Sequence, residues 1–277
     1  MPRNNQGRLD NKPEAGADAP IQDVNSLLNF VNPTEFVELP TKGRFYPKDH
    51  PLHNAESIEI KYMTAKETDI LTSKTLLKQG VAIDRMLQNI IVDKSIKVQD
   101  LFAGDKNAIM VAARISGFGA EYGANVACRS CGAQNHVNFD LSDISVKEGK
   151  DDVSFTDDGT FFVELPVTKV TVECKLISGA DESLMRRKIE KKQKMKLGES
   201  LLTDLLKTVI VSLNGVTERG VVEEFIDVMP AKDSNFLKKE YEEVKPDIDL
   251  KYHLTCESCS AENEINLPFS TNFFWPE

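Results

Sequence analysis

Two short cysteine motifs constrain the fold of this chain more than any other feature. They are CRSCGAQNHVNFDL at 128–141 and CESCSAENEINLPF at 256–269, and each places two thiols on a tight turn before a strand-like alternation. The motifs align without a gap, and six of their fourteen positions are identical. Two thiols do not complete a metal site, whereas four satisfy the tetrahedral preference of zinc. We therefore expect one shared site, with the ligands Cys128, Cys131, Cys256 and Cys259.

The expected cofactor is one structural zinc ion per chain. A site closed by four thiolates leaves no position for water or substrate, so its role would be to clamp two distant parts of the chain. The pattern is that of a zinc ribbon split by a long insertion. Iron, a redox dithiol pair and a vestigial site are the alternatives. A thioredoxin-like site is disfavoured, because neither CxxC opens a helix after a strand.

The order of elements before each cysteine motif is also repeated. FVELP occurs at 36–40 and again at 162–166, and each copy is followed by a strand-like alternation, SIEIKYM or VTVECKLI. Helical segments come next in both halves. Internal repetition of this kind changes the expected architecture. We predict an α+β fold of two tandem related repeats, each comprising a strand pair, helices and a CxxC hairpin.

Residue patterns place the helices and the boundaries of the repeats. TAKETDILTSKTLL has Thr64 as its expected N-cap and Glu67 as the capping-box partner, and SGADESLMRRKI has Ser178 as its N-cap. Helical spacing also marks VAIDRMLQNIIV and DKNAIMVAARI, while LLTDLLKTVIVSLNG parallels the former. The expected organisation is a flexible N-terminal arm (1–34), the first repeat (35–145), a linker (146–161), the second repeat (162–270) and an aromatic tail (271–277).

Composition excludes several classes of protein. The net charge of −10 argues against sequence-independent nucleic-acid binding, which needs a basic face. No apolar run approaches the length of a membrane span. Phosphate-loop, HExxH and GxSxG motifs are absent, so we expect no enzyme. The fifth cysteine, Cys174, lies in an apolar alternation and is expected to be a buried small hydrophobic residue.

Two segments are candidates for partner binding. The run RRKIEKKQKMKLG begins with Arg186, Arg187 and Lys188 and could contact an acidic protein or nucleic acid, or form a solvated helix face. The ending STNFFWPE gathers three aromatic residues, which either dock back on the body of the chain or anchor in a pocket of a neighbour. These aromatic residues are Phe273, Phe274 and Trp275.

Three stretches together resemble the baseplate hub proteins of T-even-like contractile-tailed bacteriophages. They are VELPTKGRFYP, IEIKYMTAKETDILTSKTLLKQGVAIDRMLQNIIVD and ARISGFGAEYGANVACRSCG. The resemblance covers roughly residues 35–145, the second CxxC and the aromatic tail. It implies a structural or assembly protein made in the host bacterial cytoplasm, with a place in the virion tail baseplate and with other hub proteins or the tape-measure protein as partners.

The resemblance leaves three hypotheses open. The first is a baseplate hub component or hub-assembly protein that acts through protein–protein contacts around a structural zinc. The second is a transient, chaperone-like factor that holds the tape-measure protein and is absent from the virion. The third is a zinc-ribbon protein that binds nucleic acid through its basic run.

Overall fold

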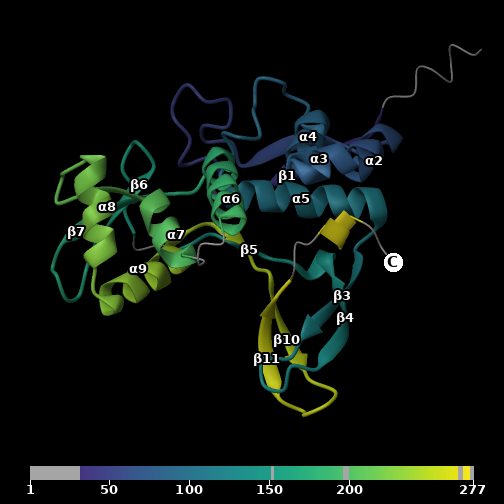
Figure 1. The fold of residues 1–277 in the computed structure, drawn as a ribbon. Coiled ribbons are helices and arrows are strands. Elements are labelled where there is room, and N and C mark those ends of the chain that lie inside the picture. The colour runs from purple at the N-terminus through teal and green to yellow at the C-terminus, as the bar shows by residue number, and fades with distance from the viewer. Residues whose placement is uncertain (1–31, 151–152, 196–199, 268–270, 275–277) are drawn as a thin grey trace, which may run out of the picture. The chain divides into compact units, whose positions relative to one another are not determined.

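An antiparallel strand pair opens each half of the described chain (Figure 1). The computed structural model describes residues 32–150, 153–195, 200–267 and 271–274. In the N-terminal half β1 (Thr34–Glu38) pairs with β2 (Ser57–Lys61). In the C-terminal half β6 (Thr160–Glu164) pairs with β7 (Thr171–Lys175), and β8 (Ile210–Leu213) extends that sheet to three strands. The first three residues of each FVELP copy thus lie in strands β1 and β6, as predicted, and the Leu-Pro pair follows the end of each strand.

Helices follow both strand pairs, so the described chain mixes α and β structure. The predicted capping box of α2 is present, because the Thr64 hydroxyl accepts from the first turn while Glu67 accepts from the Thr64 backbone N–H. Ser178 is the N-cap of α6 as predicted, and Asp181 completes a second capping box there. The helices are α2 (Ala65–Thr72), α3 (Lys74–Lys78), α4 (Ala82–Ile90), α5 (Ala103–Phe118), α6 (Gly179–Lys194), α7 (Leu201–Val209), α8 (Arg219–Val228) and α9 (Ala231–Val244).

One predicted helix is divided in the structure. The pattern TAKETDILTSKTLL predicts a continuous helix, but Ser73 has an extended backbone and separates α2 from α3. Ser73 serves both as the C-cap of α2 and as the N-cap of α3. Serine suits such a boundary because its short polar side chain favours helix caps over helix interiors.

Two β-hairpins carry the cysteine motifs and lie side by side (Figure 1). The first consists of β3 (Glu121–Ala127) and β4 (Gln134–Asp140), and the second of β10 (Lys251–Thr255) and β11 (Glu262–Asn266). In each hairpin, two antiparallel strands are joined by the turn that contains the cysteines.

Strand pairing also connects the two halves near the base of the hairpins. β5 (Val146–Lys147), within the segment expected to be a linker, pairs with β9 (Asp247–Ile248) just before the second hairpin. The described residues also include the 3₁₀ turns η2 (Leu141–Asp143) and η3 (Thr271–Phe274). The expected arm over 1–34 lies almost entirely outside the described residues.

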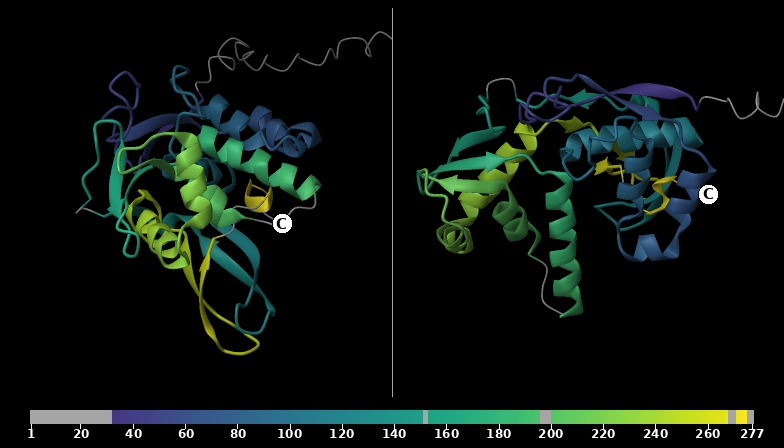
Figure 2. Two further views of the ribbon diagram at one scale, coloured as in Figure 1. Left: turned by 60° about the vertical axis from the view of Figure 1, so that its left-hand side comes forward. Right: turned by 90° about the horizontal axis from the view of Figure 1, so that it is seen from above.

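Two hydrophobic cores hold the described elements together. One core joins β1, β2, α4 and α5 to both hairpins and to η3. The other lies between β6–β8 and α7–α9, and it contains Cys174, whose side chain is fully buried as predicted. Burial raises the pKa of the Cys174 thiol to about 12, so this residue is an inert apolar group. Helix α6 stands between the helices of the two halves (Figure 2).

A buried aspartate near the start of a helix holds the turn after each FVELP strand. Asp105 of α5 accepts hydrogen bonds from the Thr41 backbone N–H at 3.0 Å and from the Thr41 hydroxyl at 2.6 Å. Asp233 of α9 accepts from the backbone N–H groups of Val167 and Thr168 at 2.8 and 3.0 Å. Each aspartate is completely buried, where a polar group needs hydrogen-bond partners. Through these hydrogen bonds, each aspartate ties the start of a helix to the end of a strand.

Acid should weaken the contact made by Asp233. Burial alone would raise the pKa of this carboxyl, but the N–H donors of Val167 and Thr168 outweigh burial and hold the pKa below its ordinary value. The ionised form therefore stabilises the fold above the unfolded-state pKa of about 3.9, and this contribution disappears as the pH falls through the lower folded-state value. We expect the difference in thermal midpoint between the wild type and Asp233→Asn to shrink between pH 6 and pH 3. A difference that stays constant would show that ionisation of Asp233 contributes nothing.

Candidate metal centre

The two cysteine turns have the same backbone geometry. In the first, the Cys128 N–H donates to Ala133 and the Gly132 N–H donates to Cys128, at 2.8 and 2.9 Å. In the second, the equivalent bonds run from Cys256 to Ala261 and from Ser260 to Cys256, at 3.0 and 2.8 Å. Gly132 and Ser260 both have positive φ, at 74° and 55°, which closes each turn directly after its second cysteine. The predicted pairing of CxxC with a hairpin is therefore confirmed in both halves.

The turns bring all four predicted ligands together. The Cys128 and Cys259 sulfurs are 3.8 Å apart, and so are those of Cys131 and Cys256. All four sulfurs lie within 4.8 Å of one another, and the cysteines carry free thiols. In a tetrahedral site with metal–sulfur bonds of about 2.3 Å, the sulfurs lie about 3.8 Å apart. The four cysteine sulfurs therefore fit around one metal ion of a kind that binds thiolates.

The electrostatics of the four thiols also suit a bound cation. Backbone N–H donors, chiefly that of Cys131, lower the pKa of Cys128 to about 6, and the N–H of Cys259 lowers that of Cys256. The Ala261 N–H acts in the same direction on Cys259, but neighbouring thiols outweigh it and raise the Cys259 pKa to about 12. Four adjacent thiolates repel one another, and a divalent cation removes that repulsion.

Two asparagines bind each turn to the other. The Asn135 side-chain oxygen accepts from the Glu257 backbone N–H at 3.0 Å, and the Asn263 oxygen accepts from the Arg129 N–H at 3.2 Å. The Asn263 amide also donates to the Cys128 sulfur at 3.4 Å. Both side chains are buried. Asn135 and Asn263 are among the identical positions of the two motifs. Each accepts a hydrogen bond from the backbone of the other turn, which explains why both turns need an amide at this position.

Removing one of these amides should loosen the metal without removing a ligand. Partners that orient ligands typically contribute ten- to hundredfold to metal affinity, so we expect about that loss in Asn135→Ala and Asn263→Ala. The matched control is Asn138→Ala, an exposed position of the same strand as Asn135. Competition with a chromogenic zinc chelator measures the three affinities. Equal metal affinity in all three variants would contradict a role for the side-chain amides of Asn135 and Asn263.

The C-terminal aromatic residues are placed within the body of the same chain. Phe273 and Phe274 are each 1% exposed and belong to the core that includes the hairpins. The Phe273 ring meets Tyr122 of β3 edge-on, with ring centres 5.1 Å apart. The side chains of Phe273 and Phe274 therefore dock back on the body of the chain, which is one of the two alternatives that the sequence left open. Trp275 lies outside the described residues.

A buried arginine, which the sequence patterns do not reveal, secures this C-terminal turn. The Arg114 guanidinium donates to the carbonyl of Phe273 at 2.7 Å, to that of Glu121 at 2.8 Å and to that of Gly119. Arg114 is fully buried, and it lies in a helical segment whose sequence pattern is mostly apolar. The segment GFGAEYG, which includes Gly119 and Glu121, is therefore held in place by Arg114 as it enters the hairpin.

The predicted basic residues lie on α6, away from the cysteine centre. Arg186 is half-buried and donates to the Gly80 carbonyl, while Arg187 and Lys188 are exposed. His136 and His253, which flank the cysteine turns in sequence, are exposed on the hairpins. In the described part of the chain, no helix combines the length and the apolarity that a membrane crossing requires.

The sequence matches the model of a known protein family. The model of the family described as T4 bacteriophage base plate protein matches residues 33–275, which includes both hairpins and the buried aromatic turn. No curated protein and no solved structure matches the chain. The match spans nearly all of the sequence and both halves of the cysteine centre. This chain therefore belongs to the T4 bacteriophage base plate protein family.

Proposed function

We propose that this chain is a component of the baseplate hub, or a protein that assembles the hub, and that it acts through protein–protein contacts. The family match over residues 33–275 carries the proposal, because a baseplate family implies a structural role among protein partners. The centre found here, a closed set of four thiols, supports a scaffold better than a catalyst. Other hub proteins and the tape-measure protein are the proposed partners, in the host cytoplasm during assembly and then in the virion baseplate.

The proposed cofactor is one zinc ion per chain, held by the four cysteines of the two hairpins. Sulfur–sulfur distances of 3.8 Å support a tetrahedral ion of this size. The ligands come from turns more than a hundred residues apart, so the ion would clamp the two halves at their hairpins. Its contribution to folding would be on the order of 10 kcal/mol.

We also propose that residues 35–145 and 162–270 are duplicated repeats. The order of strand pair, capping-box helix and cysteine hairpin recurs in both segments. A further correspondence lies in Asp105 and Asp233, which occur in the related contexts AGDKN and AKDSN. Both aspartates accept hydrogen bonds from the turn that follows an FVELP strand. Such a buried long-range contact is difficult to explain by chance similarity of short motifs.

Association with the growing baseplate tests the function directly. The tagged chain would be expressed with the hub and tape-measure proteins of a T4-like phage, and the assemblies would be separated by gradient sedimentation. We expect the chain to sediment with hub intermediates. A chain that remains at the position of the free protein in every combination would contradict the proposal. Finding it in intermediates but not in purified virions would identify the transient assembly factor instead of the virion component.

A further inference from the structure

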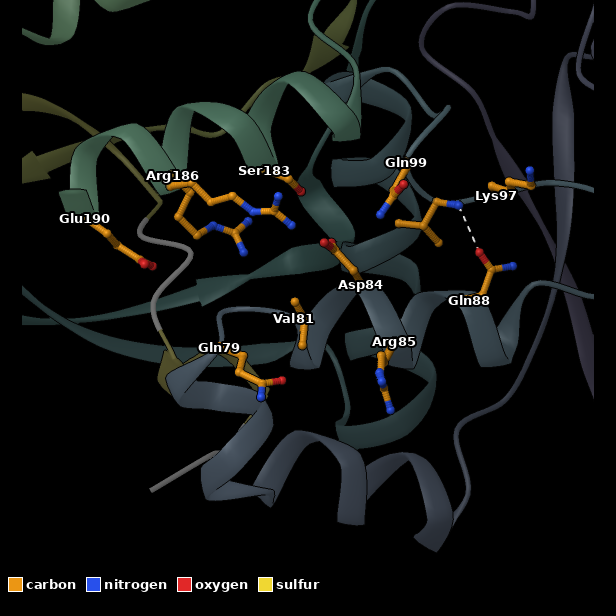
Figure 3. A pocket seen from close by; sticks show the side chains of 12 residues that line it. Gln79, Val81, Asp84, Arg85, Gln88, Lys97, Gln99, Ser183, Arg186 and Glu190 are labelled. Carbon is orange, nitrogen blue, oxygen red and sulfur yellow. Dashed lines mark hydrogen bonds between the residues drawn. The ribbon is translucent and has the colours of Figure 1, made fainter.

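A solvent-open cavity of about 440 Å³ lies between α4 of the N-terminal half and α6 of the C-terminal half (Figure 3). Arg186, Ser183 and Glu190 line it from α6, while Asp84 and Arg85 line it from α4. The segment that contains Lys97 and Gln99 forms a third wall. Cavities between structural units are common binding sites, because side chains from two units converge there.

An ionic cluster beside this cavity fixes the position of Asp84, one of the residues that line it. The Lys106 ammonium group of α5 contacts Asp84 at 2.7 Å and Glu182 of α6 at 2.8 Å. Burial alone would lower the pKa of Lys106, but the carboxylates of Glu182 and Asp84 outweigh burial and raise it. The cluster therefore stays ionised and ties α4, α5 and α6 together, with Lys106 shared between the two carboxylates.

The cations at the cavity wall are left without carboxylate partners. Within the described ranges, Arg85, Lys97 and Arg187 form no ion pair, and all three are exposed. The described lining carries four cations, Arg85, Lys97, Arg186 and Arg187, against two carboxylates, Asp84 and Glu190, and Asp84 is already paired with Lys106. The wall therefore has an excess of positive charge in a chain whose net charge is −10.

Polar groups without charge complete the lining. The side chains of Gln79, Gln99 and Ser183 face the cavity, and the described structure gives them no hydrogen bond. The Gln88 side chain, by contrast, is fixed, because its amide donates to the Ile96 carbonyl and its oxygen accepts from the Val98 N–H. Amide and hydroxyl groups of this kind satisfy the backbone of a bound peptide, which carries one donor and one acceptor per residue.

We propose that this cavity binds an acidic peptide segment of a baseplate partner. Side-chain carboxylates of the segment would pair with Arg85 and Arg187, and its backbone would contact Gln79, Gln99 and Ser183. A single strand of nucleic acid fits less well, because the part of the lining that the structure describes contains no aromatic side chain on which a base could stack. The proposal rests on the proposed function and names the chemistry of its partner.

A peptide-binding measurement on the purified full-length protein tests this site. The probe is a fluorescein-labelled peptide of alternating Glu and Gly, and its anisotropy is followed at low and physiological salt. The test variant is Arg85→Glu/Arg187→Glu. The control is Lys66→Glu/Lys238→Glu, which makes the same change in net charge at two exposed lysines outside the cavity lining. Circular dichroism and zinc content establish that both variants remain folded.

We expect the wild type and the lysine control to bind the peptide alike and the arginine variant to bind at least about tenfold more weakly. Equal binding by both variants would overturn the proposal, as would no binding by the wild type. Displacement of the peptide by single-stranded DNA of equal charge at lower concentration would also overturn it, in favour of nucleic acid. The peptide measurement needs no baseplate, so it tests the cavity alone. The proposed function is tested separately by gradient sedimentation, and the two proposals can therefore fail independently.

Discussion

Cys256→Ser is expected to abolish metal binding by the entire chain, including the half that contains Cys128 and Cys131. The reason is that the four sulfurs, within 4.8 Å of one another, surround one position and not two. With one thiolate lost, the tetrahedral site becomes incomplete, and structural zinc contributes on the order of 10 kcal/mol to folding. The variant should therefore fail to retain a metal ion and should unfold at a much lower temperature, and Cys128→Ser should do the same.

The matched control for these variants is Cys174→Ala. It also removes one thiol, but Cys174 lies in the second core, away from the hairpins. We expect this control to keep its full zinc content, although the small cavity costs about 1 kcal/mol or more. Elemental analysis and thermal unfolding provide both readouts. If Cys256→Ser and Cys128→Ser each retained half of the wild-type metal, the two hairpins would hold separate ions and the shared centre would be wrong.

The second large effect is expected for Arg114→Met. Methionine fills much of the same apolar space but leaves the carbonyls of Gly119, Glu121 and Phe273 without their donor. Each buried polar group left unpaired costs about 1–3 kcal/mol, so the free energy of unfolding should fall by about 3 kcal/mol or more. Denaturant unfolding followed by circular dichroism measures this loss.

The same variant should also release the C-terminal turn. Phe273 is attached to α5 through Arg114, so limited proteolysis should remove the C-terminus of Arg114→Met faster than that of the wild type. The control is Arg85→Met, because Arg85 is exposed on α4 and makes no ion pair within the described residues. That variant should stay within about 0.5 kcal/mol of the wild type. Equal stability of the two variants would mean that Arg114 contributes nothing through its carbonyl contacts.

Local patterns predicted the elements of the fold well. Thr64 and Ser178 start their helices as expected, since a capping box depends only on residues three positions apart. The cysteine turns were predictable for the same reason, because tight turns, thiol spacing and strand alternation are all short-range features. The shared centre required one further step, the recognition that each motif supplies half of a tetrahedral ligand set.

Contacts between distant segments were not predictable in this way. Arg114, Asp105 and Asp233 are charged residues in otherwise ordinary helices, and only the folded chain shows which backbone groups they satisfy. The pairing of β5 with β9 is not predictable from the sequence, because two-residue strands have no periodicity. Phe273 and Phe274 illustrate the same limit: an aromatic tail predicts burial, but the sequence does not say whether its own chain or a neighbour covers it.

Native mass spectrometry of the full-length protein shows directly whether one ion joins the two hairpins of a single chain. Because the four sulfurs come from one chain, we expect a monomer that carries one zinc ion and loses it after chelation. A metal-free monomer as purified, or a dimer with one ion for two chains, would contradict this expectation.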